Sequence, residues 1–146
     1  MTQIMQQALE PLSSFCTDSA VFAHTVKLYN DFGGVVLDDQ EGRNICKALG
    51  PEGKAIILQN HGILSVASTV EAAVIYFVRL EQLCEAQLLA DSSGSTNLAS
   101  PLCDKDVQEV FSQFGGEENA RAQAEALYQW IDHETKGDYK STGRYS

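Results

Sequence analysis

The feature that most constrains the fold is an apolar run of strand length that leads, after a short break, into one long apolar helix. The run covers residues 55–59 (AIILQ), and a strand with this pattern is generally covered on both faces. Asn60, His61 and Gly62 interrupt the run, and residues 63–66 extend it. Ser68 and Glu71 then have the spacing of a capping box, so we expect a helix from residue 69 to residue 89 or 90.

This long helix is expected to be covered on more than one side. Its broad apolar face is predicted to consist of Val70, Val74, Phe77, Cys84 and Leu88, widened by Ile75, Val78 and Leu89.

The rest of the chain alternates between short extended and helical patterns. We expect a short helix over residues 1–12, a strand over 35–37, and a helix that Asp38 or Asp39 caps and that ends near residue 49. Two further helices are predicted, over residues 104–111 and 117–134, separated by Gly115 and Gly116. Strands alternating with helices indicate an α/β layered fold.

Length and charge restrict the function. The 146 residues suit a single domain over residues 1–135 with a flexible tail over 136–146. The net charge of −10 disfavours binding to nucleic acid or anionic lipid. No apolar run is long enough for a membrane span and no signal peptide is evident, so a cytoplasmic protein is expected.

The four cysteines are Cys16, Cys46, Cys84 and Cys103, and they form no CxxC or Cys/His cluster. We expect all of them to be reduced and structural, and Cys84 to pack as a small apolar side chain within the long helix.

The tripeptide of Asn60, His61 and Gly62 is the strongest candidate for chemistry. A histidine after a buried strand, followed by a glycine, can direct its imidazole into a cleft. The alternative is a histidine that only satisfies backbone groups at a strand end, and residue spacing favours that alternative.

Residues 34–90 resemble the class II aldolase/adducin family over their whole length. The resemblance rests on the hydrophobic strand, the N-H-G motif, the short strand after it and the long helix. The preceding LEPLSSFCTDSAVF looks like the segment that leads into this block, and YQWIDHETKGDYK is similar to the ending of some fungal members. The resemblance implies a three-layer α/β/α sandwich, assembled as an oligomer with active sites at subunit boundaries.

The resemblance also implies a site for a divalent metal, usually zinc. In catalytic members three histidines hold the metal: an H-x-H pair and the histidine of N-H-G, which corresponds to His61. An upstream glutamate acts as acid and base, and the metal polarises the substrate. This sequence contains no H-x-H, and His24 and His133 show no ligand spacing with His61. Because catalytic zinc needs about three protein ligands, we expect the chain to lack its own metal or cofactor, with zinc bound only if a partner supplies ligands.

The resemblance favours a naturally shortened member with a small-molecule substrate. We predict a metal-independent cyclase, isomerase or lyase of fungal secondary metabolism, with His61 catalytic and with Asn60, Tyr29, Tyr76 and Arg79 as substrate contacts. For Tyr29 core packing is the alternative role, and for Arg79 it is pairing with a protein carboxylate.

Two other functions compete with this prediction. One is a zinc-dependent aldolase or epimerase completed by another chain, and the other is a non-catalytic interaction module. A sheet without its upstream strands exposes edges, so a homodimer or higher oligomer is expected.

Overall fold

The computed structural model describes residues 16–31, 39–59, 61–92 and 102–138. Their elements follow one another as α2 (Thr17–Ala20), β1 (Val26–Tyr29), α3 (Asp39–Leu49), β2 (Ala55–Leu58), β3 (Gly62–Ser65), α4 (Val70–Ser92), α5 (Asp104–Phe114) and α6 (Glu117–Thr135).

Three strands form a mixed sheet in the order β1-β2-β3. Strand β1 is parallel to β2, and α3 makes the crossover that a parallel pair requires. Strand β3 turns back antiparallel to β2, so the residues between them form a tight reversal. The register aligns Tyr29 with Leu58 and Leu58 with Gly62, so these residues lie at the same end of the sheet.

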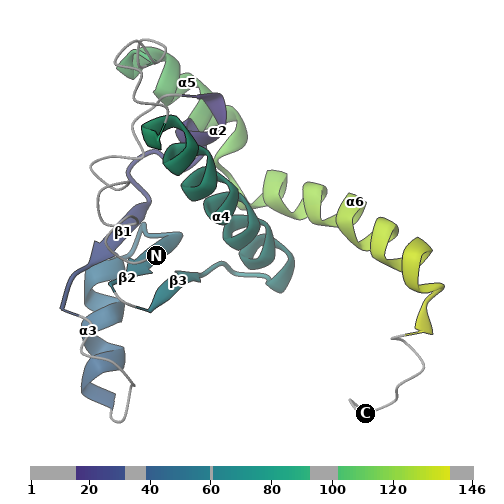
Figure 1. Ribbon diagram of the computed structural model, residues 1–146, viewed down its shortest axis with the longest axis horizontal. Helices are drawn as coiled ribbons and strands as arrows, with labels where there is room; N and C mark the ends of the chain where they lie inside the picture. Colours follow the sequence, from purple (N-terminus) through teal and green to yellow (C-terminus); the bar gives the residue numbers. More distant parts are fainter. Residues whose placement is uncertain (1–15, 32–38, 60, 93–101, 139–146) are drawn as a thin grey trace.

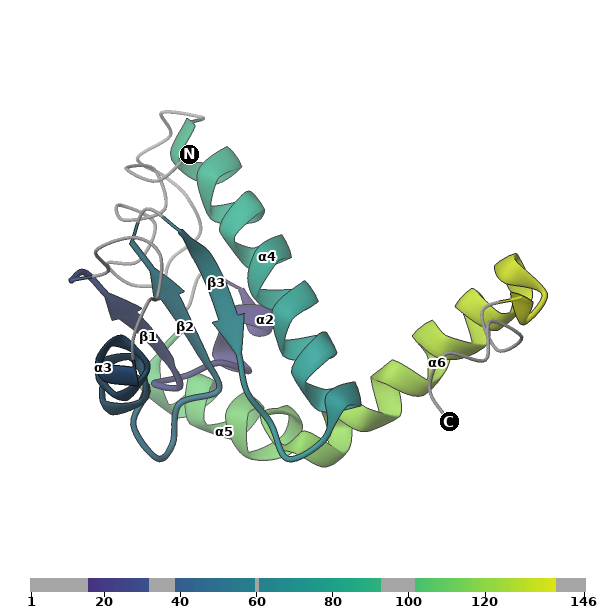
Figure 2. The same cartoon turned by 90° about the horizontal axis from the view of Figure 1, so that it is seen from below.

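The sheet is the middle of three layers, with α3 against one face and α4 against the other (Figures 1 and 2). Successive side chains of a strand point to opposite faces. Ile56 and Leu58 therefore pack with Ile45 and Leu49 of α3. Ala55 and Ile57 pack on the other side, in a larger core built mainly from α4 and α6. The predicted α/β/α layering is confirmed.

Helix α6 crosses the beginning of α4 and then extends away from the body of the molecule (Figure 2). Ala120 and Ala124 in its first half are buried, while Trp130 near its end is 60% exposed. No helix within the described ranges is long and apolar enough to cross a membrane.

The structure confirms the helices predicted over residues 104–111 and 117–134, and both end slightly later than predicted, at Phe114 and Thr135. The helix predicted to end near residue 49 begins at Asp39. The helix expected over 1–12, the strand expected over 35–37, Asp38 and most of the predicted tail lie outside the described residues.

The predicted capping box at the start of α4 is wrong. Thr69 caps the helix instead, because its Oγ1 accepts a hydrogen bond from the Ala72 amide at 3.2 Å. The Ser68 amide donates to the Glu117 carboxylate at 3.1 and 3.2 Å, so Glu117 of α6 takes the place predicted for Glu71.

The predicted buried face of α4 is also largely wrong. The residues that α4 buries are Ala72, Ile75, Tyr76, Leu80, Leu83 and Cys84. Val70, Phe77, Val78 and Leu89 are between 38% and 72% exposed. Within this chain the helix is therefore open on one side.

Candidate functional site

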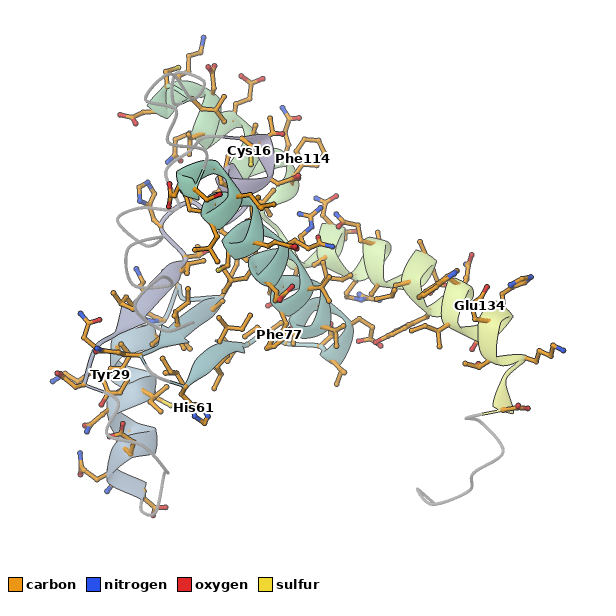
Figure 3. All side chains as sticks on the ribbon, viewed as in Figure 1. Cys16, Tyr29, His61, Phe77, Phe114 and Glu134 are labelled. Carbon is orange, nitrogen blue, oxygen red and sulfur yellow. The ribbon has the colours of Figure 1, made fainter. Side chains whose placement is uncertain are left out.

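His61 lies in the reversal between β2 and β3, at the carboxyl end of a fully buried strand. All four residues of β2 are at most 5% exposed. The Gln59 amide donates to the Tyr29 carbonyl at 3.0 Å, and the His61 amide donates to the Leu58 carbonyl at 3.1 Å. The His61 residue itself is exposed, at the end of the sheet (Figure 3). The strand thus fixes the backbone while leaving the imidazole accessible to a ligand.

Gly62 allows this reversal to be tight. Its φ is +157°, a value that residues with a side chain rarely adopt, and no atom of another residue would block an added Cβ. The glycine is therefore required by backbone conformation rather than by lack of space. Asn60 lies outside the described residues, so its predicted substrate contact stays a prediction.

Tyr29 lies at the same end of the sheet as His61, on strand β1. Its hydroxyl donates a hydrogen bond to the Glu41 carboxylate of α3 at 3.2 Å. Burial, followed by the charge of Glu41 and this hydrogen bond, raises the pKa of Tyr29 above its ordinary value of 10.0. The ring is 8% exposed and packs in the core beside α3, so the alternative of core packing is confirmed. Its contact with a substrate stays a prediction.

Tyr76 lies in the core near the opposite end of the sheet from His61. It is 1% exposed, its ring meets Phe22 edge to face at 5.9 Å, and its hydroxyl is 3.4 Å from the Gly115 carbonyl. Burial raises the pKa of its hydroxyl. The structure does not bring Tyr76 together with His61, and its predicted substrate contact remains untested.

Arg79 lines a separate cleft of about 540 Å³ between α2, α4 and α6. The alternative of pairing with a protein carboxylate is not met among the described residues, since no hydrogen bond or ion pair joins Arg79 to any of them. His61 is not among the residues that line this cleft, so the structure does not bring Arg79 and His61 into one site.

The zinc site that the resemblance implies needs ligands besides His61. Within the described parts of the chain, no three His, Cys, Asp or Glu residues are grouped so that they could hold a metal ion. His24 precedes β1 and so lies at the other end of the sheet, and His133 lies near the end of α6. His61 is thus the one histidine at this end of the sheet, whereas the implied site needs three.

The cysteines are unpaired, as predicted. Cys84 is buried, and burial raises the pKa of its thiol to about 11. Cys16 is partly buried, whereas Cys46 and Cys103 are exposed.

Sequence patterns did not predict the contacts of Lys54, which directly precedes β2 and reaches the turn between α5 and α6. The Lys54 ammonium donates to the Gly115 carbonyl and lies 4.6 Å from the Phe111 ring centre and 5.4 Å from that of Tyr76. Burial lowers the pKa of this lysine. The partners are 61 residues apart, so local spacing carries no signal for the contact.

Comparison with known proteins places the chain among aldolase-like sequences. The family model described as Class II Aldolase and Adducin N-terminal domain matches residues 1–88. Decarboxylase NovR of Streptomyces niveus is 41% identical over 86 residues, which cover 59% of this chain and 30% of that protein. Alpha-adducin of Rattus norvegicus is 43% identical over 72 residues, covering 48% of this chain and 10% of that protein.

Solved structures agree with the sequence comparison. The L-fuculose 1-phosphate aldolase from Glaciozyma antarctica PI12 superposes with a TM-score of 0.77 at 33% identity, over 94% of this chain and 50% of that one. An aldolase II superfamily protein from Pseudomonas syringae shares the fold, with a TM-score of 0.72 at 24% identity over 92% of this chain and 54% of its own. The chain thus spans about half the length of these structures and less than a third of the curated relatives above.

Proposed function

Because the chain belongs to the class II aldolase and adducin family, we propose that it acts as a small-molecule enzyme of the lyase, isomerase or cyclase type, with His61 as its catalytic residue. The observation that carries the proposal is the exposed His61 at the end of a buried, hydrogen-bonded strand. Catalytic groups work best when the scaffold holds their backbone in place.

Among the three reaction types, a lyase is favoured. Decarboxylases and aldolases both break a carbon–carbon bond next to a carbonyl group, and these two names occur among the relatives. In a retro-aldol step, a base removes the proton of the β-hydroxyl group and the carbon–carbon bond breaks. The electron pair moves onto the carbonyl oxygen, and the resulting enolate is then protonated at carbon. A histidine can both take up and return such protons.

We propose Asn60, the residue before His61 in the sequence, as the polar contact for a developing oxyanion, which a metal-independent reaction has to stabilise. Tyr29 is at the same end of the sheet, but its proton is directed to Glu41, so the phenol has none left for the substrate while that bond is made.

We propose independence from metal because His61 is a single imidazole among the described residues at this edge. The competing function is a zinc enzyme whose remaining ligands come from another chain or another part of a longer protein. The proposal includes four further predictions. The substrate is a small molecule and the assembly a homo-oligomer; the location is cytoplasmic and the pathway belongs to fungal secondary metabolism.

We propose a non-catalytic interaction module as the second candidate, because the match to an adducin is longer than the match to the decarboxylase. Beta-adducin of Homo sapiens is 33% identical over 117 residues, which cover 72% of this chain, against 86 residues for the decarboxylase.

One assay separates these functions. The purified chain is incubated with L-fuculose 1-phosphate and with an aromatic 2-oxo acid, the class of compound in the name of a further relative, 4-hydroxy-3-prenylphenylpyruvate oxygenase. The incubations are run with and without a chelator, and the products are followed by proton NMR. We expect turnover that the chelator leaves unchanged, and a fall in kcat of roughly 100-fold or more in His61→Asn. His24→Asn is the matched control, because His24 lies at the other end of β1 and asparagine tolerates its φ of 60°.

The other outcomes are equally informative. Stoichiometric zinc that is lost in His61→Asn, together with turnover that needs zinc, would replace the metal-independent enzyme by the zinc enzyme. A folded chain with no turnover of either compound would favour the interaction module.

A further inference from the structure

The cleft between α2, α4 and α6 has the composition of a binding site for an organic ligand. Its volume of about 540 Å³ is within the range of small-molecule pockets. It is lined by apolar side chains with a few polar groups among them, and none of its lining residues belongs to a strand: Cys16, Asp18, Ile75, Val78, Arg79, Gln82, Leu83, Ala86, Gln123 and Leu127.

Three helices converge to form this cleft. Helix α4 contributes Ile75, Arg79 and Gln82, which are three or four residues apart and therefore share one side of the helix. Helix α6 adds Gln123 and Leu127 with the same spacing. The base of the cleft is firmly held, since Ile75 and Leu83 are at most 7% exposed and belong to the main core.

Arg79 gives the cleft its chemical preference. It is half-buried, and among the described residues it has no hydrogen-bonding or ion-pair partner. A guanidinium on an apolar wall is a favourable site for a carboxylate, because its planar fork can donate two parallel hydrogen bonds. Asp18 lines the same cleft at its exposed side, so a second negative group on the ligand would be repelled.

From this geometry we infer that the α2–α4–α6 cleft binds a monocarboxylate with an apolar or aromatic body, at a site separate from His61. The carboxylate pairs with Arg79, the body packs on Ile75, Leu83 and Leu127, and the amides of Gln82 and Gln123 border it. Arg79 then serves a ligand of its own instead of a substrate at the end of the sheet.

The test uses 4-phenylbutyrate as the probe and its neutral amide as the matched compound. Titration calorimetry on the full chain gives the affinities, and ¹⁵N NMR of the Gln82 and Gln123 side-chain amides and of Arg79 Nε reports the position. We expect the acid to bind roughly tenfold more tightly than the amide, which is the size expected for a charge-assisted hydrogen bond. Arg79→Met should abolish the difference, and Arg79→Lys should keep part of it.

Asp18→Asn should change the affinity for the acid in the direction opposite to Arg79→Met. Removal of this anion should tighten binding of the acid about twofold and leave the amide unchanged. His61→Asn should leave both affinities unchanged, so that failure of the proposed enzyme activity and failure of this site are distinguishable. Equal binding of acid and amide, an unaltered acid affinity in folded Arg79→Met, or loss of binding in His61→Asn would each overturn the inference.

Discussion

The carboxylate of Glu117 ties the start of α6 to the start of α4. It accepts hydrogen bonds from both the amide and the hydroxyl of Ser68. These bonds, with a smaller contribution from the charge of Lys54, lower the pKa of Glu117 from its ordinary value of 4.5. A carboxylate whose pKa is lower in the folded state adds stability above the unfolded pKa and loses it as the pH falls through the folded value.

Glu117→Gln should therefore reduce the free energy of unfolding at pH 7 by about 0.5–1 kcal/mol, since the bonds are partly exposed to solvent. Urea denaturation at pH 7 and at pH 3 measures the effect. Glu118→Gln is the control, because Glu118 occupies the same helical turn and is exposed. A loss of the same size at both pH values, or in both variants, would contradict this role of the carboxylate.

The cysteines differ in burial and therefore should differ in reactivity. The thiolate is the reactive form, and burial raises the pKa of Cys84 to about 11. In the native protein at pH 8, a chromogenic disulfide reagent should modify Cys46 and Cys103 rapidly and Cys84 only on the timescale of unfolding. Peptide mass mapping identifies the sites, and a Cys84→Ala variant that keeps the slow phase would rule out this assignment.

At single residues, sequence reasoning succeeded where the signal was local. The N-H-G motif predicted His61 at the end of a strand, and the structure has it there; its catalytic role stays a prediction. It failed for Ser68, whose partner lies 49 residues further along the chain. The Tyr29–Glu41 bond was missed for the same reason, since its partners belong to different elements.

At the scale of the elements, two glycines, one inside α3 and one just after it, should have opposite effects on stability when each is changed to alanine. Gly42 lies inside the helix with space for a methyl group, whereas a Cβ on Gly53 would lie 2.2 Å from the Leu49 carbonyl oxygen at the end of the same helix. Alanine is favoured over glycine in a helix interior because less backbone entropy is lost. At Gly53, the close contact of the new methyl group with the Leu49 oxygen should destabilise the fold by more than this entropy gain stabilises it.

Gly42→Ala should raise the free energy of unfolding by about 0.5–1 kcal/mol. Gly53→Ala should lower it by about 1–3 kcal/mol. Thermal denaturation of both variants beside the wild type tests the pair. If both variants shift in the same direction, the local environments described for these glycines would be incorrect.

Helix α4 shows why an element can be predicted while its buried face is not. Its sequence is apolar nearly all round, so the helix itself is predicted easily and periodicity does not select one side. The choice is made by what lies beside it, and here α6, β3 and β2 contact the helix, which buries Ala72, Tyr76 and Leu80. The fold class followed from the order of patterns, but the packing depended on contacts between distant elements.

At the scale of the whole molecule, the described residues include apolar side chains exposed on the open side of α4 and on the projecting end of α6. Phe77 is 43% exposed on α4, and Trp130 is 60% exposed on α6. In the described residues β1 and β3 also each have one edge without a strand partner. Edges and apolar faces of this kind favour association with another polypeptide.

We therefore expect a homodimer or larger oligomer in solution, with Trp130 as its reporter. Because it is the single tryptophan of the chain, its fluorescence should shift to shorter wavelength as the protein concentration rises, in step with the mass from light scattering. Phe77→Ser should weaken association, whereas Phe114→Ser should not, although Phe114 is 49% exposed, because Phe114 lies at the end of α5 and Figure 3 draws it well apart from Phe77 of α4. A monodisperse monomer with concentration-independent fluorescence would mean that this apolar surface stays open to solvent in the isolated chain.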